Sequence, residues 1–388
     1  MVKVIVADSA PVDEFLEWLG RQRCINAGER YLTAEPGTFL HRRQMEQHWV
    51  IADACDYLSA RERGVDVERL LHGRYLLLTR LAHAKRDLDT APNGRSAVPG
   101  RFAELLIGGA GPDYVHELIS AAGLTARGCS IDWLGEDSGL GEFTCDVETG
   151  RVVHVECKRL LNDALQTVKE DAAATIGDVI AGAVAQHNLV GEVHVAISAG
   201  VAGKPTVIDT VEWMAEGLAG GEGVVDADGV ELKYRLETAL VDQRDFAELI
   251  PQSPDRYVMH AQGSRGTLTI TLQGPQRDAA WLVRKVIDVA VERAADSQLP
   301  EDSPGLVCLE LPFFSDAEYI DSLGEATEVL FERRHVIALL GTVHTVVRPS
   351  PDAGLVNSPG RFYCNKFTNF PAERDAWQRA WHTLKTPS

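Results

Sequence analysis

The sequence predicts an α/β fold whose central part runs helix, three strands, helix, strand. Two neighbouring segments, residues 142–147 and 152–158, alternate apolar and polar side chains as half-buried strands do. A Thr-Gly pair at residues 149–150 suits the turn between them. A long Ala-rich amphipathic segment, residues 164–187, follows, and residues 192–198 again alternate like a strand.

Composition limits the kinds of protein this can be. The chain has 388 residues, 45% hydrophobic and 24% charged, enough for two or three domains with their own cores. Lys and Arg number 38 and Asp and Glu 57, so the net charge is −19, which repels polyanions unless basic side chains gather locally. We expect a cytoplasmic protein with no signal peptide and no contact with a membrane, because no run of about 18 apolar residues occurs. The seven cysteines show no CxxC spacing and predict reduced thiols rather than disulfides or a zinc site.

Residues 1–99 are predicted to form a mainly helical N-terminal region with a basic segment. A short strand is expected at residues 2–6, and helices are expected at 13–22, 45–62 and 67–84. Residues 61–101 contain nine basic and five acidic residues, which gives this segment a net charge of +4. This pattern indicates either a solvated helix face or a surface that follows a phosphate backbone. The residues assigned to nucleic-acid binding are Arg74, Arg80, Lys85 and Arg86.

Residues 100–200 are predicted to form the core domain, and residues 201–388 a further α/β region of unknown role. The core begins with an interrupted helical segment, residues 101–123, followed by a strand at residues 130–134. In the C-terminal region, the patterns indicate helices at 277–295 and 317–331 and strands at 306–311 and 336–347.

The segment VVHVECKRL, residues 152–160, carries the strongest chemical signal. Side chains alternate along a strand, so Glu156 and Lys158 share one side with His154 while Cys157 points to the other. A charged pair in an otherwise apolar strand needs a metal, a partner charge or solvent, because burying an unpaired charge is costly.

The preceding strand offers two acidic partners for Glu156. Asp146 with Glu156, joined by the Cys157 carbonyl, would supply the hard oxygen ligands that Mg²⁺ prefers. A register centred on Thr149 would instead place Glu142 opposite Glu156. Both acids cannot contact one ion, because four residues of strand span about 13 Å. We prefer Asp146.

The pairing of Asp146 with the triplet Glu156-Cys157-Lys158, within this order of elements, resembles the PD-(D/E)XK nuclease superfamily, which has the restriction-endonuclease-like fold. The resemblance covers about a quarter of the chain. It implies that the two acids hold Mg²⁺, with Mn²⁺ able to take its place, and that Lys158 assists water attack on a phosphodiester. It also implies an acid on the preceding helix, which we assign to Glu104, with Glu117 as the rival. Gln186, on the helix after the triplet, is a weaker candidate. The family's Pro before the first acid is absent, since Cys145 stands there.

A second Glu-x-Lys, residues 231–233, serves as an internal comparison and predicts only a strand wetted on one side. The leading hypothesis is a Mg²⁺-dependent nuclease that hydrolyses phosphodiester bonds, with DNA favoured over RNA as the partner. A homodimer would suit cleavage of both strands. The alternative is a catalytically inactive nuclease-like scaffold that binds a protein or nucleic acid.

Overall fold

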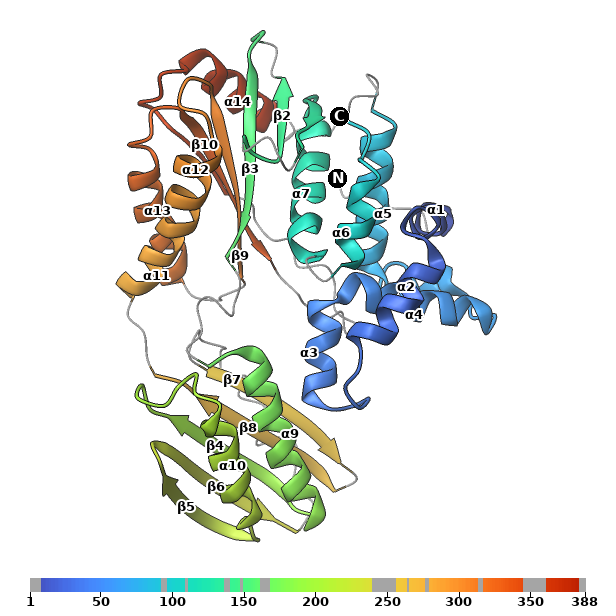
Figure 1. The fold of residues 1–388 in the computed structure, drawn as a ribbon, viewed down its shortest axis with the longest axis vertical. Helices are drawn as coiled ribbons and strands as arrows, with labels where there is room; N and C mark the ends of the chain where they lie inside the picture. Colours follow the sequence, from blue (N-terminus) through green and yellow to red (C-terminus); the bar gives the residue numbers. More distant parts are fainter. Residues whose placement is uncertain are drawn as a thin grey trace.

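The computed structural model describes residues 8–91, 96–108, 111–135, 140–146, 149–160, 168–238, 256–263, 265–275, 279–312, 317–344 and 361–383. Within these ranges the chain forms a mixed α/β structure with two mixed sheets, which confirms the predicted fold class at that level (Figure 1). The strand expected at residues 2–6 lies outside the described residues. Across the described ranges, no helix combines the length and the apolar character needed to span a bilayer.

The N-terminal region is helical, as its periodicity predicts. Its helices are α1 (Ala10–Leu19), α2 (Arg21–Tyr31), α3 (Phe39–Gln47), α4 (Trp49–Glu62), the short 3₁₀ helix η1 (Val67–Leu70), α5 (Leu76–Asp89) and α6 (Arg101–Ile107). The helix expected at residues 13–22 ends earlier, at Leu19, because Gly20 turns the chain with a φ of 86°, a conformation that favours glycine. Most of these helices bury apolar faces in one core together with one face of the first sheet.

The first sheet, sheet A, carries the triplet on its third strand. Its strand order is β1-β2-β3-β9-β10-β11, with β3, β9 and β10 parallel and the other neighbours antiparallel. These strands are β1 (Ser130–Trp133), β2 (Phe143–Asp146), β3 (Val152–Arg159), β9 (Gly305–Pro312), β10 (Val336–His344) and β11 (Arg361–Cys364). The helices that flank them are α7 (Gly111–Thr125), α11 (Ala279–Ile287), the π-helical continuation η4 (Asp288–Ala295), α12 (Asp296–Gln298), α13 (Ala317–Leu330) and α14 (Pro371–Thr383). Helix α7 packs on one face of the sheet, whereas η4 and α13 pack on the other.

Between β3 and α11 the chain leaves sheet A and builds a second sheet, sheet B, with strand order β5-β6-β4-β8-β7. Its elements are α9 (Glu170–Gln186), β4 (Val190–Ile197), α10 (Thr206–Glu216), β5 (Gly221–Ala227), β6 (Val230–Glu237), β7 (Arg256–Gly263) and β8 (Gly266–Gln273). Helices α9 and α10 lie together on one face of it (Figure 1).

The prediction that the helix and strand directly after the triplet complete the core is wrong. Strand β4 pairs with β6 and β8 in sheet B, and the strand beside β3 is β9. Hydrophobic alternation identifies a strand but does not say which sheet it joins. The order helix, three strands, helix, strand does occur in sheet A, with α11–η4 and β9 as its last members, so the predicted core segment, residues 100–200, contains parts of both sheets.

The N-terminal helices also contact the sheet B module. The carboxylate of Asp178 on α9 accepts hydrogen bonds from the backbone N–H groups of Phe39 (2.6 Å) and Leu40 (3.0 Å) at the start of α3. Arg43 on α3 forms an ion pair with Glu170 on α9. These contacts satisfy the free donors of a helix N-terminus and connect two parts of the fold that are distant in sequence.

Candidate active site

The centre of the site is an ion pair on β3. Glu156 is only 1% exposed, and its carboxylate pairs with the Lys158 ammonium, which is 26% exposed at the side-chain level. The other carboxylate oxygen, Oε2, has no hydrogen-bond donor among the described residues. A buried carboxylate with one partner and one unsatisfied oxygen is costly, which marks the position as chemically special.

Burial and neighbouring charges shift the pKa values of this pair. Burial raises the pKa of Glu156 to about 7, although Lys158 acts to lower it. Burial lowers the pKa of Lys158, but the carboxylates of Glu156 and Glu142 outweigh it and hold that pKa above its ordinary value. Lys158 is therefore a cation at neutral pH and not a free base.

The acid that lies opposite Glu156 is Glu142. In the β2–β3 hairpin Asp146 pairs with Val152 and Phe143 with Val155, so the register is centred on Thr149 and one further step brings Glu142 to Glu156. The backbone N–H of Glu142 donates to the Val155 carbonyl at 2.9 Å, which extends this register.

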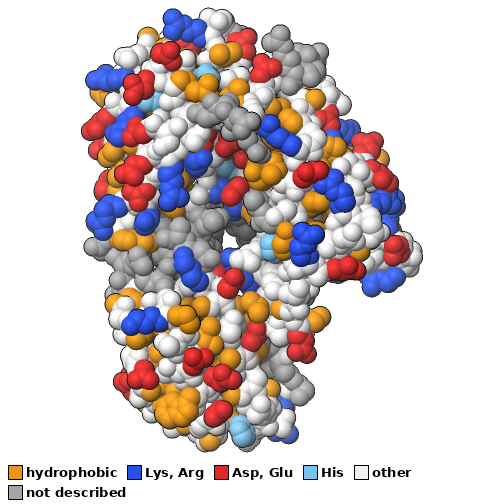
Figure 2. All heavy atoms as spheres, viewed as in Figure 1, with side chains coloured by type: hydrophobic (Ala, Val, Ile, Leu, Met, Phe, Trp, Pro, Cys, Tyr) orange, Lys and Arg blue, Asp and Glu red, His pale blue; other side chains and the backbone are white. Residues whose placement is uncertain are grey.

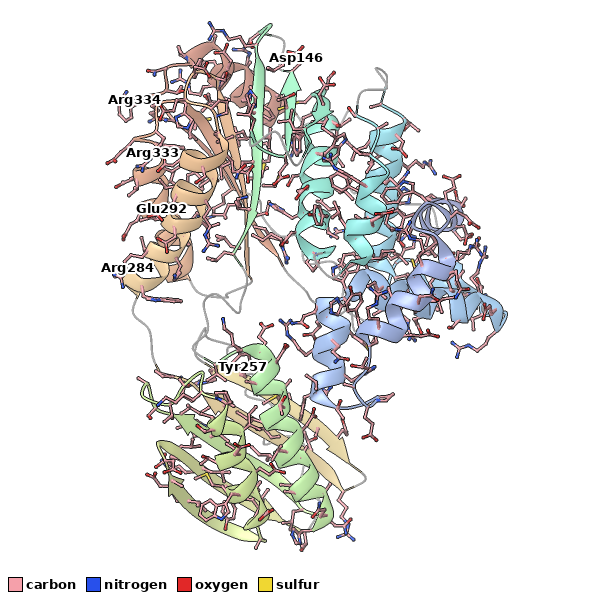
Figure 3. The ribbon with its side chains drawn as sticks, viewed as in Figure 1. Asp146, Tyr257, Arg284, Glu292, Arg333 and Arg334 are labelled. Atoms are coloured by element: carbon pink, nitrogen blue, oxygen red, sulfur yellow. The ribbon has the colours of Figure 1, made fainter. Side chains whose placement is uncertain are left out.

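The preference for Asp146 is therefore wrong, and the alternative register is the one observed. Asp146 is exposed at the turn end of the hairpin (Figure 3), about 13 Å along the strand from the level of Glu156. Apolar and polar side chains alternate along both strands whichever register is formed. The sequence pattern alone therefore does not distinguish the register that pairs Asp146 with Glu156 from the one that pairs Glu142 with it.

Glu117, the rival assignment, lies on α7, which covers the face of sheet A opposite to the one that carries Glu156 and its register partner Val307. Burial, together with the negative charges of Glu142 and Glu156, raises the pKa of Glu117 to about 9. Glu104 is not part of the site, since its side chain on α6 is 75% exposed and pairs with Arg23 at 3.4 Å. The segment expected as one interrupted helix forms α6 and α7, and only α7 packs against β3.

These groups gather where β3 extends beyond its neighbour. Strand β2 begins at Phe143, opposite Val155, so residues after Val155 have no β2 partner in the described part of the chain. Carbonyls of alternate residues point to the same strand edge, and the Val155 carbonyl bonds to Glu142. The Cys157 carbonyl therefore points toward the same open edge, near Glu142. The Cys157 side chain is buried in the core on the α7 face.

The donors at this edge fit a hard divalent cation in kind. Glu142, Glu156 and the Cys157 carbonyl are the oxygen ligands that Mg²⁺ and Mn²⁺ take, and Oε2 of Glu156 lacks a donor. In the described residues, no three His, Cys, Asp or Glu side chains stand close enough together to hold a metal ion. A cation here would thus have two carboxylates and a carbonyl from the protein, with water completing the shell, as is usual for Mg²⁺.

Two of the four basic residues assigned to nucleic-acid binding form ion pairs with acids. Arg74 pairs with Asp56 at 2.7 Å, and Lys85 pairs with Asp89 while its ammonium lies over the Trp18 ring. Burial lowers the pKa of Arg80. Arg86 is exposed on α5. Arg80 is exposed as well. Basic and acidic side chains are interspersed over the visible face in Figure 2.

Two further sequence assignments lie away from the site. Gln186 is the exposed last residue of α9, which packs on sheet B, so it does not approach β3. In the comparison motif, Lys233 pairs with Glu231 at 2.7 Å, but both side chains are well exposed on β6. The two Glu-x-Lys motifs therefore differ in burial, as the patterns of the two strands predict.

Sequence reasoning missed one charged group beside the site. Arg159, directly after Lys158, forms ion pairs with Glu310 on β9 and with Asp113 on α7, the latter at 3.2 Å. Glu310 lies in an apolar strand, LVCLELP, which is the same signal that singled out Glu156. That signal was available in the sequence.

Comparison of the chain with protein-family models, with curated proteins and with solved structures finds no match. The resemblance to a nuclease superfamily therefore stays a proposal, supported by the residues themselves.

Proposed function

We propose that this protein is a Mg²⁺-dependent nuclease of the PD-(D/E)XK type that hydrolyses phosphodiester bonds, with DNA as the preferred substrate. The observation that carries the proposal is the Glu156–Lys158 pair, buried at an open strand edge with the carboxyl groups of Glu142 and Glu117 as electrostatic neighbours. A cluster of acids whose pKa values are raised around one lysine is typical of catalytic sites.

Each residue has a role that follows from its position. Glu142, Glu156 and the Cys157 carbonyl would hold the ion, which when bound supplies Lewis-acid stabilisation of charge on the phosphate. Lys158 is held by Glu156 and can orient a water molecule and offset developing negative charge through its ammonium hydrogens. Glu117, whose pKa is raised to about 9, keeps its proton at neutral pH and so adds no negative charge near Glu142 and Glu156.

The remaining proposals concern context. All seven cysteines are free thiols, as a cytoplasmic location requires, so we place the protein there. Arg86 would contribute one phosphate contact, and binding that depends on such contacts should weaken as the salt concentration rises. A homodimer would allow both strands of a duplex to be cut.

The direct test is cleavage of plasmid, linear duplex DNA, single-stranded DNA and RNA with Mg²⁺ or Mn²⁺. Glu142→Gln, Glu156→Gln and Lys158→Met should each lower cleavage at least about 100-fold, because each removes a ligand or the water-orienting cation. Asp146→Asn and Lys233→Met are matched controls and should cleave like the wild type, since neither residue belongs to the site.

Cleavage that survives all three site substitutions would refute this mechanism. Loss of cleavage in Asp146→Asn equal to that in Glu142→Gln would refute the assigned register.

A second function is favoured by a specific observation. Lys158 is already paired with Glu156, and the described residues hold no group of three metal-ligating side chains. Both features suit an inactive scaffold in which the pair is purely structural. If the wild-type protein takes up no Mn²⁺ in a calorimetric titration and cuts none of the four substrates, the scaffold is the correct function.

A further inference from the structure

The loop between β11 and α14, residues 365–370, presents one aromatic ring to solvent. Phe367 is 66% exposed, the largest exposed fraction among the large apolar side chains of the described residues. The other aromatic side chains in the stretch RFYCNKFTNF, residues 361–370, are half-buried or buried. Phe362, for example, stacks on Trp381 with 4.8 Å between the ring centroids. Of the aromatic rings in this stretch, Phe367 is therefore the one that a ligand can reach.

Buried polar side chains hold this loop in place. Asn365 is fully buried, and its Nδ2 donates to the Val336 carbonyl at 2.8 Å while its Oδ1 accepts from the Phe367 backbone N–H at 2.9 Å. The Thr368 hydroxyl donates to the Arg334 carbonyl at 2.8 Å. These contacts fix the backbone on both sides of Phe367. The ring could turn into the core only if buried hydrogen bonds were broken, which is costly.

Two cations lie beside the exposed ring. The guanidinium carbon of Arg334 lies 5.6 Å from the centre of the Phe367 ring, and its Nη1 donates to the Phe367 carbonyl at 2.7 Å. Figure 3 shows Arg334 at the periphery of the molecule, on the side that carries α13. Lys366 is exposed directly before the ring. Within the described residues neither cation forms an ion pair, whereas the neighbouring Arg333 and Arg374 do pair with acids.

An exposed ring beside two free cations suits a nucleotide. Unpaired bases stack on aromatic side chains, and Arg and Lys contact the phosphates of the same strand. A base pair within a duplex does not offer this contact, because its bases are already stacked on their neighbours. A protein partner would have to supply both an apolar pocket for the ring and acids for the cations, whereas a nucleotide carries a planar base and an anion in one unit.

We propose that Phe367, Arg334 and Lys366 form a binding platform for single-stranded DNA, on which one unpaired base stacks while the two cations contact neighbouring phosphates. The choice of nucleic acid as the ligand rests on the proposed function. The platform itself is separate from the Glu156–Lys158 pair and requires neither a bound cation nor cleavage. Because the loop is held in place before binding, little conformational entropy is lost when the strand binds.

The test is fluorescence anisotropy with a labelled single-stranded oligodeoxynucleotide in EDTA, so that no metal-dependent cleavage occurs. Phe367→Ala should weaken binding at least about 5-fold, because this is the lower end of what one base stacked on an aromatic ring contributes. Phe367→Leu keeps an apolar side chain but removes the aromatic face, and it should lose nearly as much. The same oligonucleotide annealed to its complement should bind the wild type and Phe367→Ala with affinities within about 2-fold of each other.

Lys366→Ala tests the charged part of the platform separately. Loss of one phosphate contact should reduce the slope of log K against log salt concentration by about 0.7 for a single strand. Phe367→Ala should leave this slope unchanged, because the ring carries no charge. A slope that Lys366→Ala does not change would remove Lys366 from the platform and overturn the proposal as stated.

Trp213 on α10 provides a matched control for an exposed aromatic ring. It is 63% exposed, but its exposed neighbours on the helix are the acids Asp209, Glu212 and Glu216. Trp213→Ala should therefore bind the single strand with an affinity within about 2-fold of that of the wild type. Equal losses in Trp213→Ala and Phe367→Ala would show that the cations beside Phe367 do not matter and would overturn the platform.

Other results would also overturn the proposal. One is wild-type affinity of Phe367→Ala for the single strand, and another is an equal loss on the single strand and the duplex. Sedimentation velocity gives a third: a wild-type dimer that Phe367→Ala converts to a monomer would place a second copy of the chain on the ring instead of DNA.

The platform and the proposed function can fail independently. If the wild type binds the single strand through Phe367 in EDTA but cuts none of the four substrates with Mg²⁺ or Mn²⁺, the platform stands and the nuclease assignment fails. If the wild type cuts DNA but Phe367→Ala binds the single strand as the wild type does, the nuclease assignment stands and the platform is refuted.

Discussion

Replacement of Lys158 by methionine tests whether the buried ion pair is the energetic centre of the site. Methionine keeps the length of the side chain but removes its charge. Glu156, 1% exposed, would then be a carboxylate without a counter-charge. Removing one partner of a buried pair costs about 3–5 kcal/mol, because the remaining charge stays desolvated.

The size of this loss should depend on pH. The pKa of Glu156 is raised from 4.5 to about 7 by burial, so its contribution to stability is complete below pH 4.5 and is lost as the pH rises toward 7. Loss of Lys158 raises that pKa further, so the variant keeps losing stability above neutral pH after the wild type has stopped. We expect a loss of about 1 kcal/mol at acidic pH, where a proton neutralises Glu156. At alkaline pH we expect about 3–5 kcal/mol.

Native-state hydrogen exchange of β3 amides provides the assay, because it reports the local free energy of opening in a chain with several cores. Lys233→Met is the control. Its ion pair with Glu231 has 53% and 36% of the two side chains exposed, so the change should cost less than about 1 kcal/mol in β6 at either pH.

Two results would refute this reasoning. Equal losses in the two variants would show that burial does not distinguish the two Glu-x-Lys pairs. A loss in Lys158→Met that is independent of pH would show that Glu156 does not carry the unpaired charge.

Three further outcomes follow from the structure. The pKa of Glu117 is raised from 4.5 to about 9, so the melting temperature of the metal-free protein should fall as the pH rises from 4.5 to 9. In Glu117→Gln, thermal melts over the same pH series should show a smaller fall in melting temperature. A fall equal to that of the wild type would contradict this prediction. Gly141 has a φ of +89°, and an added Cβ would lie 2.8 Å from the Val155 carbonyl oxygen, so Gly141→Ala should destabilise the protein by more than about 1 kcal/mol in urea unfolding. Arg86→Ala should reduce the salt dependence of DNA binding by about one phosphate contact, whereas Lys85→Ala should change it little, since Lys85 is 14% exposed and already bonded to a carboxylate. Fluorescence anisotropy over a salt series measures the salt dependence of DNA affinity for each variant. Equal salt dependence in the two variants would argue against the assignment of Arg86 to phosphate binding.

The periodicity of apolar residues predicted helices and strands well where a few neighbouring residues are enough to determine them. The hairpin of β2 and β3 and the strands β9 and β10 occur near their expected positions. In the N-terminal region α1 and α4 do so as well, whereas α2 was not expected and the helix expected at residues 67–84 is divided into η1 and α5. The long Ala-rich segment is a helix, as expected, but it covers the other sheet. Periodicity is a property of a few adjacent residues, and it does not encode partners more than 100 residues away.

The candidate site residues also fall into those that neighbouring residues identify and those that only contacts distant in the sequence identify. Glu156, Lys158 and the backbone of Cys157 were identified from one strand, because a charged pair in an apolar strand is visible locally. Choosing Glu142 over Asp146 required the hairpin register, and choosing Glu117 over Glu104 required knowing which helix packs on β3.

The sequence by itself determined that this chain is α/β and that one apolar strand carries a Glu-Cys-Lys triplet, since alternation and composition act over short distances. Only the tertiary structure decided which acids join the triplet, and that Arg159 pairs with acids on α7 and β9. The reason is that strand register, sheet membership and helix packing arise from contacts between segments that are far apart in the chain.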